Sequence, residues 1–272
     1  GRILAGAGTG HLVTFYNCYV IPVRSTDPRK GNDSRQGIMD TIRMIVEITS
    51  RGGGVGVNWS TLRPRGAYVR GVNGTSSGPV SWMMGADAIV QQVEQGGSRR
   101  GAQMYMLDDW HPSVIEFIQV KQDLKVIQST NLSVGVSDRF MRAVENDEDW
   151  TFIFPDLDHP DYNKLWDGDI EKWIARGLPV KEYDTIKARE LWNMICESAW
   201  KCGEPGVIWT ERYNKMSNTW YFERIRCVNP CGEQGLGEWG VCNLGAINLT
   251  AFVKDGSLDY ENLKATISSA VK

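Results

Sequence analysis

Three of the six cysteines lie in one short stretch, Arg226 to Leu249, RCVNPCGEQGLGEWGVCNLGAINL. Asn229 and Glu233 stand two residues before and two residues after the middle cysteine, Cys231. Side chains of an extended segment alternate between two faces, so this spacing predicts an amide, a thiol and a carboxylate that face one ligand. Such a group could bind and deprotonate a diol, with Glu233 as general base and Asn229 as hydrogen-bond partner. A turn in which the same residues only pack and cap is an equal alternative on spacing alone.

The neighbours of Cys231 narrow the chemistry further. Pro230 restricts the backbone and Gly232 frees it, which predicts a tight, exposed loop tip. The sequence has no Cys-x-x-Cys pair and no histidine near Cys231, and its three histidines are scattered. The pattern therefore argues against a structural zinc site and against a Cys/His hydrolase, and no metal ligands are expected.

The composition excludes several classes of protein. A net charge of -3 gives no basic excess, so neither a nucleic acid nor an anionic membrane is expected as partner. No apolar run approaches the ~20 residues of a membrane span, and GRILAGAGTG lacks the features of a signal peptide. Six cysteines in 272 residues are too few for a disulfide-stapled secreted scaffold. These observations predict a cytoplasmic protein.

Strand and helix patterns alternate along the chain and predict a single α/β domain over residues 1–272 with parallel strands. The apolar run 14–23, which contains Cys18, predicts a buried strand, and a helix capped by Asp33 or Ser34 follows it. Further helices are expected at 81–95, 112–121, 137–145 and 185–202, and strand and turn at 206–214. The Gly/Ser-rich loop 65–82 is long enough to predict a ligand-binding role. The chain ends in an amphipathic helix without a stop signal, so we expect a fragment truncated at both ends.

The motif NPCGEQ, followed by CNLGAINL, resembles the active-site finger loop of ribonucleotide reductase catalytic chains. The stretches GRILAGAGT, NCYVIPV, RGGGVGVNWSTLRPRG, GTSSGPVSWM, GGSRRGAQM and ESAWKCGEPGV occur in the expected order, so the resemblance covers essentially the whole chain. The sequences of these stretches most resemble those of the class II, adenosylcobalamin-dependent enzymes. The resemblance implies about half of the ten-stranded α/β barrel of this family, with a central finger loop and the complementary half as a partner.

The resemblance also assigns roles to the cysteines. It implies that Cys231 becomes a thiyl radical that removes the 3′-hydrogen of the ribose, that Glu233 accepts the 3′-hydroxyl proton, and that Asn229 holds the hydroxyls. Cys18 and Cys242 would be the reducing pair, which ends as a disulfide. Cys227 is expected only to pack. The implied substrate-binding residues are Asn17, Cys18, Gly54, Asn229, Pro230, Cys231, Gly232 and Glu233.

An allosteric site is implied as well. The helix that begins at Asp33 and the loop 63–77 resemble the specificity site, where a deoxynucleoside triphosphate effector binds. The segment 96–103 resembles the loop that connects effector and substrate, although Arg99 and Arg100 could equally be solvated surface charges. The implied effector residues are Asp33, Ser34, Arg63, Arg70, Ser98, Arg99, Arg100 and Gln103.

The function implied by the resemblance is reduction of ribonucleoside di- or triphosphates to 2′-deoxyribonucleotides for DNA synthesis. Adenosylcobalamin would be the cofactor and a thioredoxin-like protein the reductant, and a homodimer is left open. One alternative is a class I large subunit, whose radical comes from a separate subunit; dependence on adenosylcobalamin would separate the two. Another is a nucleotide-binding regulatory fragment without activity alone, against which the presence of all five catalytic residue types argues.

Overall fold

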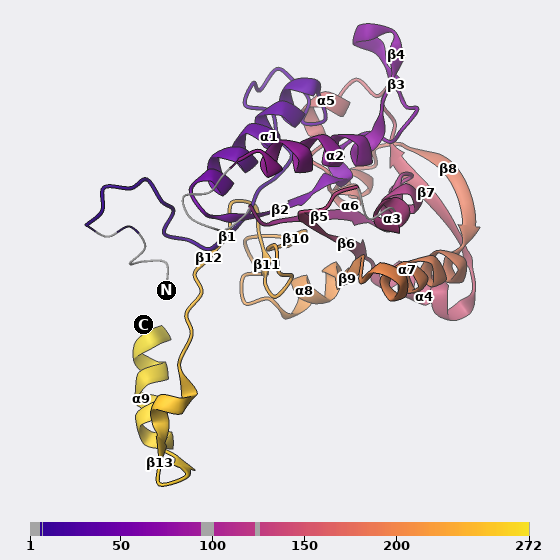
Figure 1. Ribbon diagram of the computed structural model, residues 1–272. Helices are drawn as coiled ribbons and strands as arrows, with labels where there is room; N and C mark the ends of the chain where they lie inside the picture. The colour runs from indigo at the N-terminus through magenta and orange to yellow at the C-terminus, as the bar shows by residue number, and fades with distance from the viewer. Residues whose placement is uncertain (1–5, 7, 94–100, 123–125, 272) are drawn as a thin grey trace.

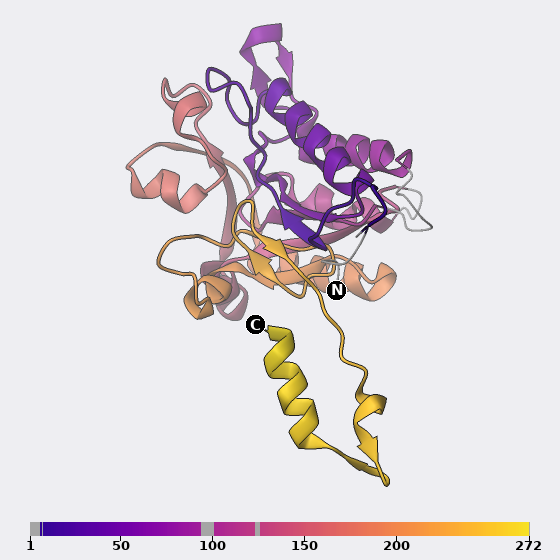
Figure 2. The same cartoon turned by 90° about the vertical axis from the view of Figure 1, so that its left-hand side faces the viewer.

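A six-stranded sheet forms the centre of the computed structural model, which describes residues 6, 8–93, 101–122 and 126–271. The strand order is β12-β1-β2-β5-β6-β9, in which β1, β2, β5, β6 and β9 run parallel and β12 runs antiparallel to β1. The sheet curls into a half-barrel, which confirms the predicted fold class (Figure 2). Its strands are β1 Cys18–Val20, β2 Gly54–Asn58, β5 Gln103–Asp108, β6 Thr130–Val136, β9 Gly206–Trp209 and β12 Val241–Cys242.

Helices connect successive parallel strands, as that topology requires. Helix α1 (Arg35–Ser50) and helix α2 (Gly78–Gln91) lie together against one face of the sheet (Figure 1). The Oγ of Ser34 accepts a hydrogen bond from Gly37 N at 3.1 Å, so the predicted N-cap of α1 is confirmed. The other helices are α3 Val114–Gln119, α4 Asp138–Asn146, α5 Tyr162–Leu165, α6 Ile170–Ala175, α7 Ala188–Cys202, α8 Thr210–Met216 and α9 Tyr260–Val271.

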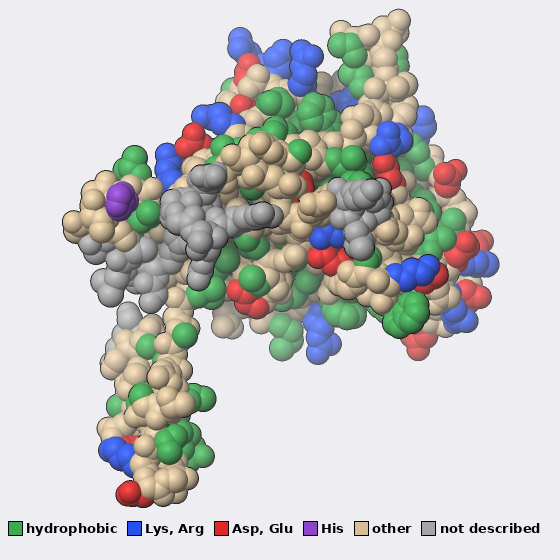
Figure 3. All heavy atoms as spheres, in the orientation of Figure 1, with side chains coloured by type: hydrophobic (Ala, Val, Ile, Leu, Met, Phe, Trp, Pro, Cys, Tyr) green, Lys and Arg blue, Asp and Glu red, His purple; other side chains and the backbone are tan. Residues whose placement is uncertain are grey.

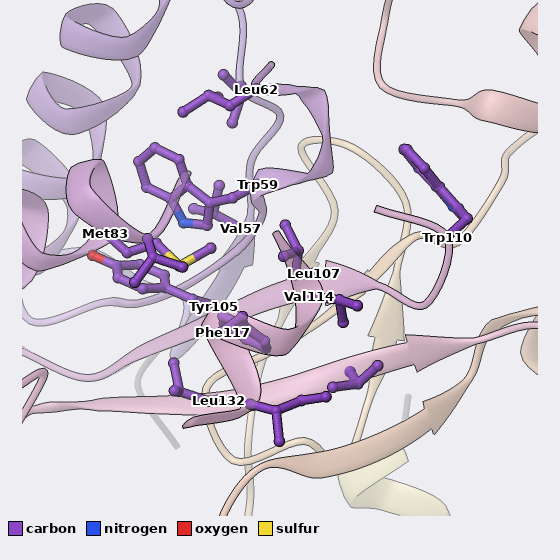
Figure 4. Close-up of a cluster of buried hydrophobic side chains, with 14 of the residues drawn as sticks. Val57, Trp59, Leu62, Met83, Tyr105, Leu107, Trp110, Val114, Phe117 and Leu132 are labelled. Carbon is purple, nitrogen blue, oxygen red and sulfur yellow. The ribbon is translucent and has the colours of Figure 1, made fainter. Parts of the chain in front are cut away.

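The main core lies between the sheet and α1, α2 and α3. Every residue of β2 is buried, which is expected of a parallel strand covered on both faces. Trp59, at the end of β2, packs edge-to-face on Tyr105 of β5, with ring centroids 5.3 Å apart (Figure 4). Both side chains are fully buried, so the aromatic pair is part of the core that joins β2 to β5.

The described residues also form four two-stranded hairpins. In the largest of them, one sequence-based prediction is wrong. The helix expected at 185–202 begins only at Ala188, because residues 185–187 pair with residues 149–151 in the antiparallel β7–β8 hairpin. Likewise, residues 210–216 form helix α8 where only a turn was expected. The hairpin strands are β3 Tyr68–Val69, β4 Gly74–Thr75, β7 Asp149–Pro155, β8 Val180–Lys187, β10 Cys227–Val228, β11 Gly235–Leu236, β13 Val253–Lys254 and β14 Ser257–Leu258.

After Cys242 the chain leaves the half-barrel as an arm that carries β13, β14 and α9 (Figures 1 and 3). The amphipathic C-terminal helix is confirmed, but none of its described residues is buried. The arm exposes the apolar side chains Leu244, Leu249, Val253, Tyr260, Ile267 and Val271. Exposed apolar surface of this kind fits the expectation that the half-barrel packs against further polypeptide. Among the described residues, no helix combines the length and the apolar character needed to cross a membrane.

Candidate active site

The finger loop is a hairpin, in which a short turn joins β10 to β11. Gly232 N donates to Asn229 O at 2.9 Å, with Pro230 and Cys231 at the two central positions of the turn. Gly232 has a φ of +78°, a conformation that glycine adopts without strain. Cys231 is therefore exposed at the tip, as predicted. The prediction of an extended segment around Cys231 is wrong, because residues 230–233 form a turn.

Two glycines of β2 allow this hairpin to lie directly on the sheet. A Cβ at Gly56 would lie 1.9 Å from Val228 O, and a Cβ at Gly54 would lie 2.7 Å from Pro230 Cγ. Both positions must therefore lack a side chain for the hairpin to approach. Gly54 and Pro230 are both among the residues predicted to bind substrate, and Pro230 fills the space next to Gly54. From β6, Asn131 Nδ2 donates to Pro230 O at 2.7 Å, an attachment that the sequence motifs did not reveal.

Asn229 connects the hairpin to β1. Its Oδ1 accepts from Gln234 N at 3.0 Å, which closes the turn, and its Nδ2 donates to Cys18 Sγ at 3.4 Å. The residue is 0% exposed, and a buried amide of this kind needs such partners. The amide therefore fixes the turn that carries Cys231 next to the thiol of Cys18.

Cys18 and Cys242 face each other across the β1–β12 pair. Their Sγ atoms and a carboxylate oxygen of Glu233 all lie within 4.8 Å of one another. Asn17 holds the two strands together, since its N donates to Cys242 O and its Oδ1 accepts from Leu244 N, both at 2.9 Å. Both cysteines are free and buried, so the structure brings together a reduced thiol pair and one acid.

The electrostatic environment keeps Cys231 and Cys242 protonated. Burial, the carboxylate of Glu233 and the neighbouring Cys18 raise the pKa of Cys231. Burial and the Cys18 thiol, with a contribution from Glu233, raise the pKa of Cys242 to about 12. Both groups are S–H at neutral pH, which suits transfer of hydrogen atoms and disfavours thiolate attack.

Cys227 has a separate, structural role. Burial raises the pKa of Cys227 well above the usual range of a thiol. Its side chain belongs to a small apolar cluster with Val20, Met104, Met106 and Val228. The expectation that Cys227 only packs therefore agrees with its surroundings.

A cavity of about 500 Å³ lies at the start of α1, away from the hairpin, and Asp33, Ser34, Arg63 and Arg70 all line it. Asp33 Oδ2 accepts from Arg63 Nε and from Tyr162 OH, each at 2.7 Å. This ion pair is largely buried, whereas Arg70 reaches Asp158 on the surface. The cavity also contains cations and aromatic rings that the resemblance did not supply, notably Lys181, Trp82 and Tyr183.

Gln103, another expected effector residue, does not line this cavity. Gln103 lies in β5, where its Nε2 donates to Thr130 Oγ1 at 3.1 Å and its Oε1 accepts from Tyr105 OH at 2.6 Å. It borders a second hollow, of about 280 Å³. Ser98, Arg99 and Arg100 lie outside the described residues.

Together, fold and site define a parallel α/β half-barrel in which a finger-like hairpin lies beside two facing cysteines. Residues 16–272 match the family model described as "Ribonucleotide reductase, barrel domain". The chain belongs to the ribonucleotide reductase family.

The relatives agree with this assignment. Over 98% of the chain, 36% of residues are identical to a vitamin B12-dependent ribonucleoside-diphosphate reductase of Thermoplasma acidophilum, of which 31% is covered. The corresponding enzyme of Mycobacterium tuberculosis is 34% identical over 99% of the chain and 34% of that protein. A ribonucleoside-diphosphate reductase large subunit of Variola virus is 30% identical over 89% of the chain and 32% of that protein. The chain spans about a third of the length of these relatives.

Proposed function

We propose that this chain provides the thiol centre of a ribonucleotide reductase, which reduces ribonucleotides to 2′-deoxyribonucleotides for DNA synthesis. One observation carries the proposal: a carboxylate oxygen of Glu233 lies within 4.8 Å of both thiols of the Cys18–Cys242 pair, and the same hairpin carries Cys231, which interacts electrostatically with Glu233 and Cys18. Removal of a 2′-hydroxyl needs an initiating thiol, a base and a two-electron reductant. Those groups stand here on one side of one sheet.

In the proposed mechanism Cys231, as a thiyl radical, removes the 3′-hydrogen of the ribose and becomes a thiol. Glu233 accepts the 3′-hydroxyl proton. The resemblance assigns Asn229 to hold the hydroxyls, whereas its buried amide, bonded to Gln234 N and Cys18 Sγ, supports a role in positioning the turn. One thiol of the Cys18–Cys242 pair gives a proton to the 2′-hydroxyl, which leaves as water, and the other thiol hydrogen goes to the 2′-carbon. Glu233 returns its proton to the 3′-oxygen at the end. The pair is oxidised to a disulfide as the ribonucleotide is reduced, and Cys231 gives the 3′-hydrogen back. Because Cys231 and Cys242 stay protonated, hydrogen atoms are available at neutral pH.

Adenosylcobalamin is the proposed cofactor; when bound, it would provide the radical chemistry that converts the Cys231 thiol to a thiyl radical. The two relatives described above whose names state vitamin B12 dependence support this choice. The residues present fit it at one point, because the Cys231 thiol is exposed at the hairpin tip and can be reached from outside the sheet. A thioredoxin-like protein would return the disulfide to thiols.

For the cavity at the start of α1 we propose a deoxynucleoside triphosphate as ligand. Its volume is in the range of sites for small molecules and cofactors. The N-terminus of a 16-residue helix and the guanidinium of Arg70 suit phosphate groups, while Trp82 and Tyr183 can stack on a base.

The test uses the full-length protein with a ribonucleoside diphosphate or triphosphate, dithiothreitol and adenosylcobalamin. We expect deoxynucleotide formation that requires the cofactor and is lost in Cys231→Ser, while that variant still binds nucleotide. Cys196→Ser, which changes an exposed cysteine of α7, is the matched control and should keep activity. Reduction by the Cys231→Ser variant would remove Cys231 from its assigned role. Activity that instead requires a separate radical-bearing subunit would favour the class I alternative.

A further inference from the structure

The group formed by Cys18, Cys242 and Glu233 has a property that the reductase reaction does not use. Two thiols and one carboxylate offer ligand atoms that lie within 4.8 Å of one another. A tetrahedral zinc ion binds sulfur at about 2.3 Å and carboxylate oxygen at about 2.0–2.2 Å, which corresponds to ligand separations of about 3.6–3.8 Å. A movement on the order of 1 Å would therefore bring all three atoms around one ion.

We propose that the reduced thiol pair and Glu233 supply three ligands to a thiophilic divalent cation, Zn²⁺ or Cd²⁺. The fourth position would be open to water, because Glu233 lies at the exposed end of the group. Binding replaces both thiol protons, so that one cation enters and the protons of Cys18 and Cys242 are released. The site needs neither a radical nor a nucleotide, and it goes beyond the proposed function.

The surroundings of the group support coordination. Cys18 and Cys242 are held in register by the β1–β12 pair, so the two sulfur ligands are preorganised. Asn229 Nδ2 donates to Cys18 Sγ at 3.4 Å, and such a contact would stabilise a metal-bound thiolate. Glu233 comes from the hairpin beyond the turn and is exposed, so its side chain can rotate toward the ion.

Metal binding and catalysis would exclude each other. A bound cation occupies both reductant sulfurs and the general base at once, whereas the disulfide form has no thiolate to offer. The site is therefore open to metal only in the reduced enzyme. Hard cations such as Mg²⁺ are not expected to compete, because they prefer oxygen ligands.

The first test is a titration of the full-length protein with Cd²⁺, followed by the ultraviolet sulfur-to-cadmium charge-transfer absorption. We expect the reduced protein to show an absorption that disappears in Cys18→Ser and in Cys242→Ser, and after oxidation of the wild type. The Cys196→Ser control should keep it, and Glu233→Gln should lower the affinity by at least about tenfold, in the range of a lost supporting ligand. Equal absorption in the wild type, Cys18→Ser and Cys242→Ser would overturn the proposal.

A second measurement needs no variant and so does not depend on how the variants fold. Alkylation of the reduced wild type is followed cysteine by cysteine by mass spectrometry, with and without Zn²⁺. Protection of Cys18 and Cys242, with Cys231 and Cys196 modified at unchanged rates, supports the site. Modification of all four at unchanged rates refutes it. Neither measurement involves turnover, so a protein that binds metal but reduces no nucleotide would contradict the proposed function alone.

Discussion

Cys18 and Cys242 are directly opposite each other on neighbouring antiparallel strands, although they lie near opposite ends of the chain. β1 is the first strand of the sheet along the chain, and β12, which follows the finger hairpin in sequence, pairs with β1 at the edge of the sheet. Two buried thiols in this relationship can close to a disulfide with little backbone movement. The pairing that the family resemblance implied therefore has a plain structural basis, and it leads to the first prediction.

Replacement of Cys18 is expected to stop multiple turnover. In Cys18→Ser the thiol pair is gone, so no disulfide can form and deoxynucleotide production in the presence of dithiothreitol should fall to background. The matched control is Cys227→Ala, which removes a buried sulfur that only packs. It should lower the free energy of unfolding by about 1 kcal/mol while activity is retained. Product formation by Cys18→Ser at the wild-type rate would contradict the assigned pair.

Gly56→Ala should displace the finger hairpin. The new Cβ would lie 1.9 Å from Val228 O, and a backbone oxygen cannot yield without movement of β10. We expect a loss of about 1–3 kcal/mol in the free energy of unfolding, together with loss of nucleotide reduction. Gly85→Ala is the control, because a Cβ there meets nothing within 4 Å and alanine favours the helix that contains it. Urea denaturation of both variants measures the difference; equal stability would show that the hairpin does not need this contact.

Asn131 is predicted to be a positioning residue. Its Nδ2 donates to Pro230 O, so Asn131→Ala frees the turn that presents Cys231. We expect a lower kcat with an unchanged KM and a loss of about 1 kcal/mol in stability. Asn146→Ala, which removes an exposed amide bonded to Glu148, should change neither quantity. A stability loss without any change in kcat would mean that Asn131 has no role beyond folding.

Arg70→Ala is expected to weaken binding of a deoxynucleoside triphosphate in the cavity at the start of α1. Arg70 is exposed and pairs with Asp158 at the rim, and exposed ion pairs contribute little, so stability should be unchanged. Loss of a charge-assisted phosphate contact should lower the affinity by roughly tenfold, as measured by equilibrium dialysis. Arg29→Ala is the control, because Arg29 pairs with Asp27 outside the cavity. If both variants bind alike, the effector is not held by Arg70.

We expect the buried carboxyl of Asp109 to make the free energy of unfolding depend on pH. The carboxyl is 1% exposed; Oδ2 accepts from Ser137 N at 2.6 Å, while Oδ1 has no hydrogen-bond partner within the part of the chain that is described. Burial raises the pKa of Asp109 from 3.8 to about 7, against the effect of the Ser137 hydrogen bonds. The folded state therefore keeps a proton that the unfolded state loses between pH 4 and pH 7.

The sign of the effect follows from that difference. Asp109 contributes most stability below about pH 4, and this contribution falls by up to about 1.4 kcal/mol per unit as pH rises toward 7. Asp109→Asn cannot ionise and should remove this slope from the pH profile of the free energy of unfolding, measured with urea. An identical slope in wild type and variant would assign the dependence to other groups.

The sequence by itself determined the family and the alternation of strands and helices, and it predicted the candidate reactive residues, because each depends on residue types and local spacing. The N-cap at Ser34, the buried strand β2 and the exposed tip at Cys231 are local properties of this kind. Spacing suggested that Asn229, Cys231 and Glu233 face one ligand if the segment is extended, but the segment is a turn, so the spacing argument does not apply.

Only the tertiary structure decided which groups meet. The approach of the hairpin depends on Gly54 and Gly56, which are far from it in sequence and whose missing side chains leave room for Pro230 and Val228. The same is true of the contact from Asn131 and of β8, whose pairing with β7 overrides the helical pattern at residues 185–187. Each of these features is a contact between segments that are distant in sequence. A local sequence pattern does not show which distant segment it will contact. The convergence of two thiols with a carboxylate, on which both catalysis and the proposed metal site depend, is a property of the folded chain alone.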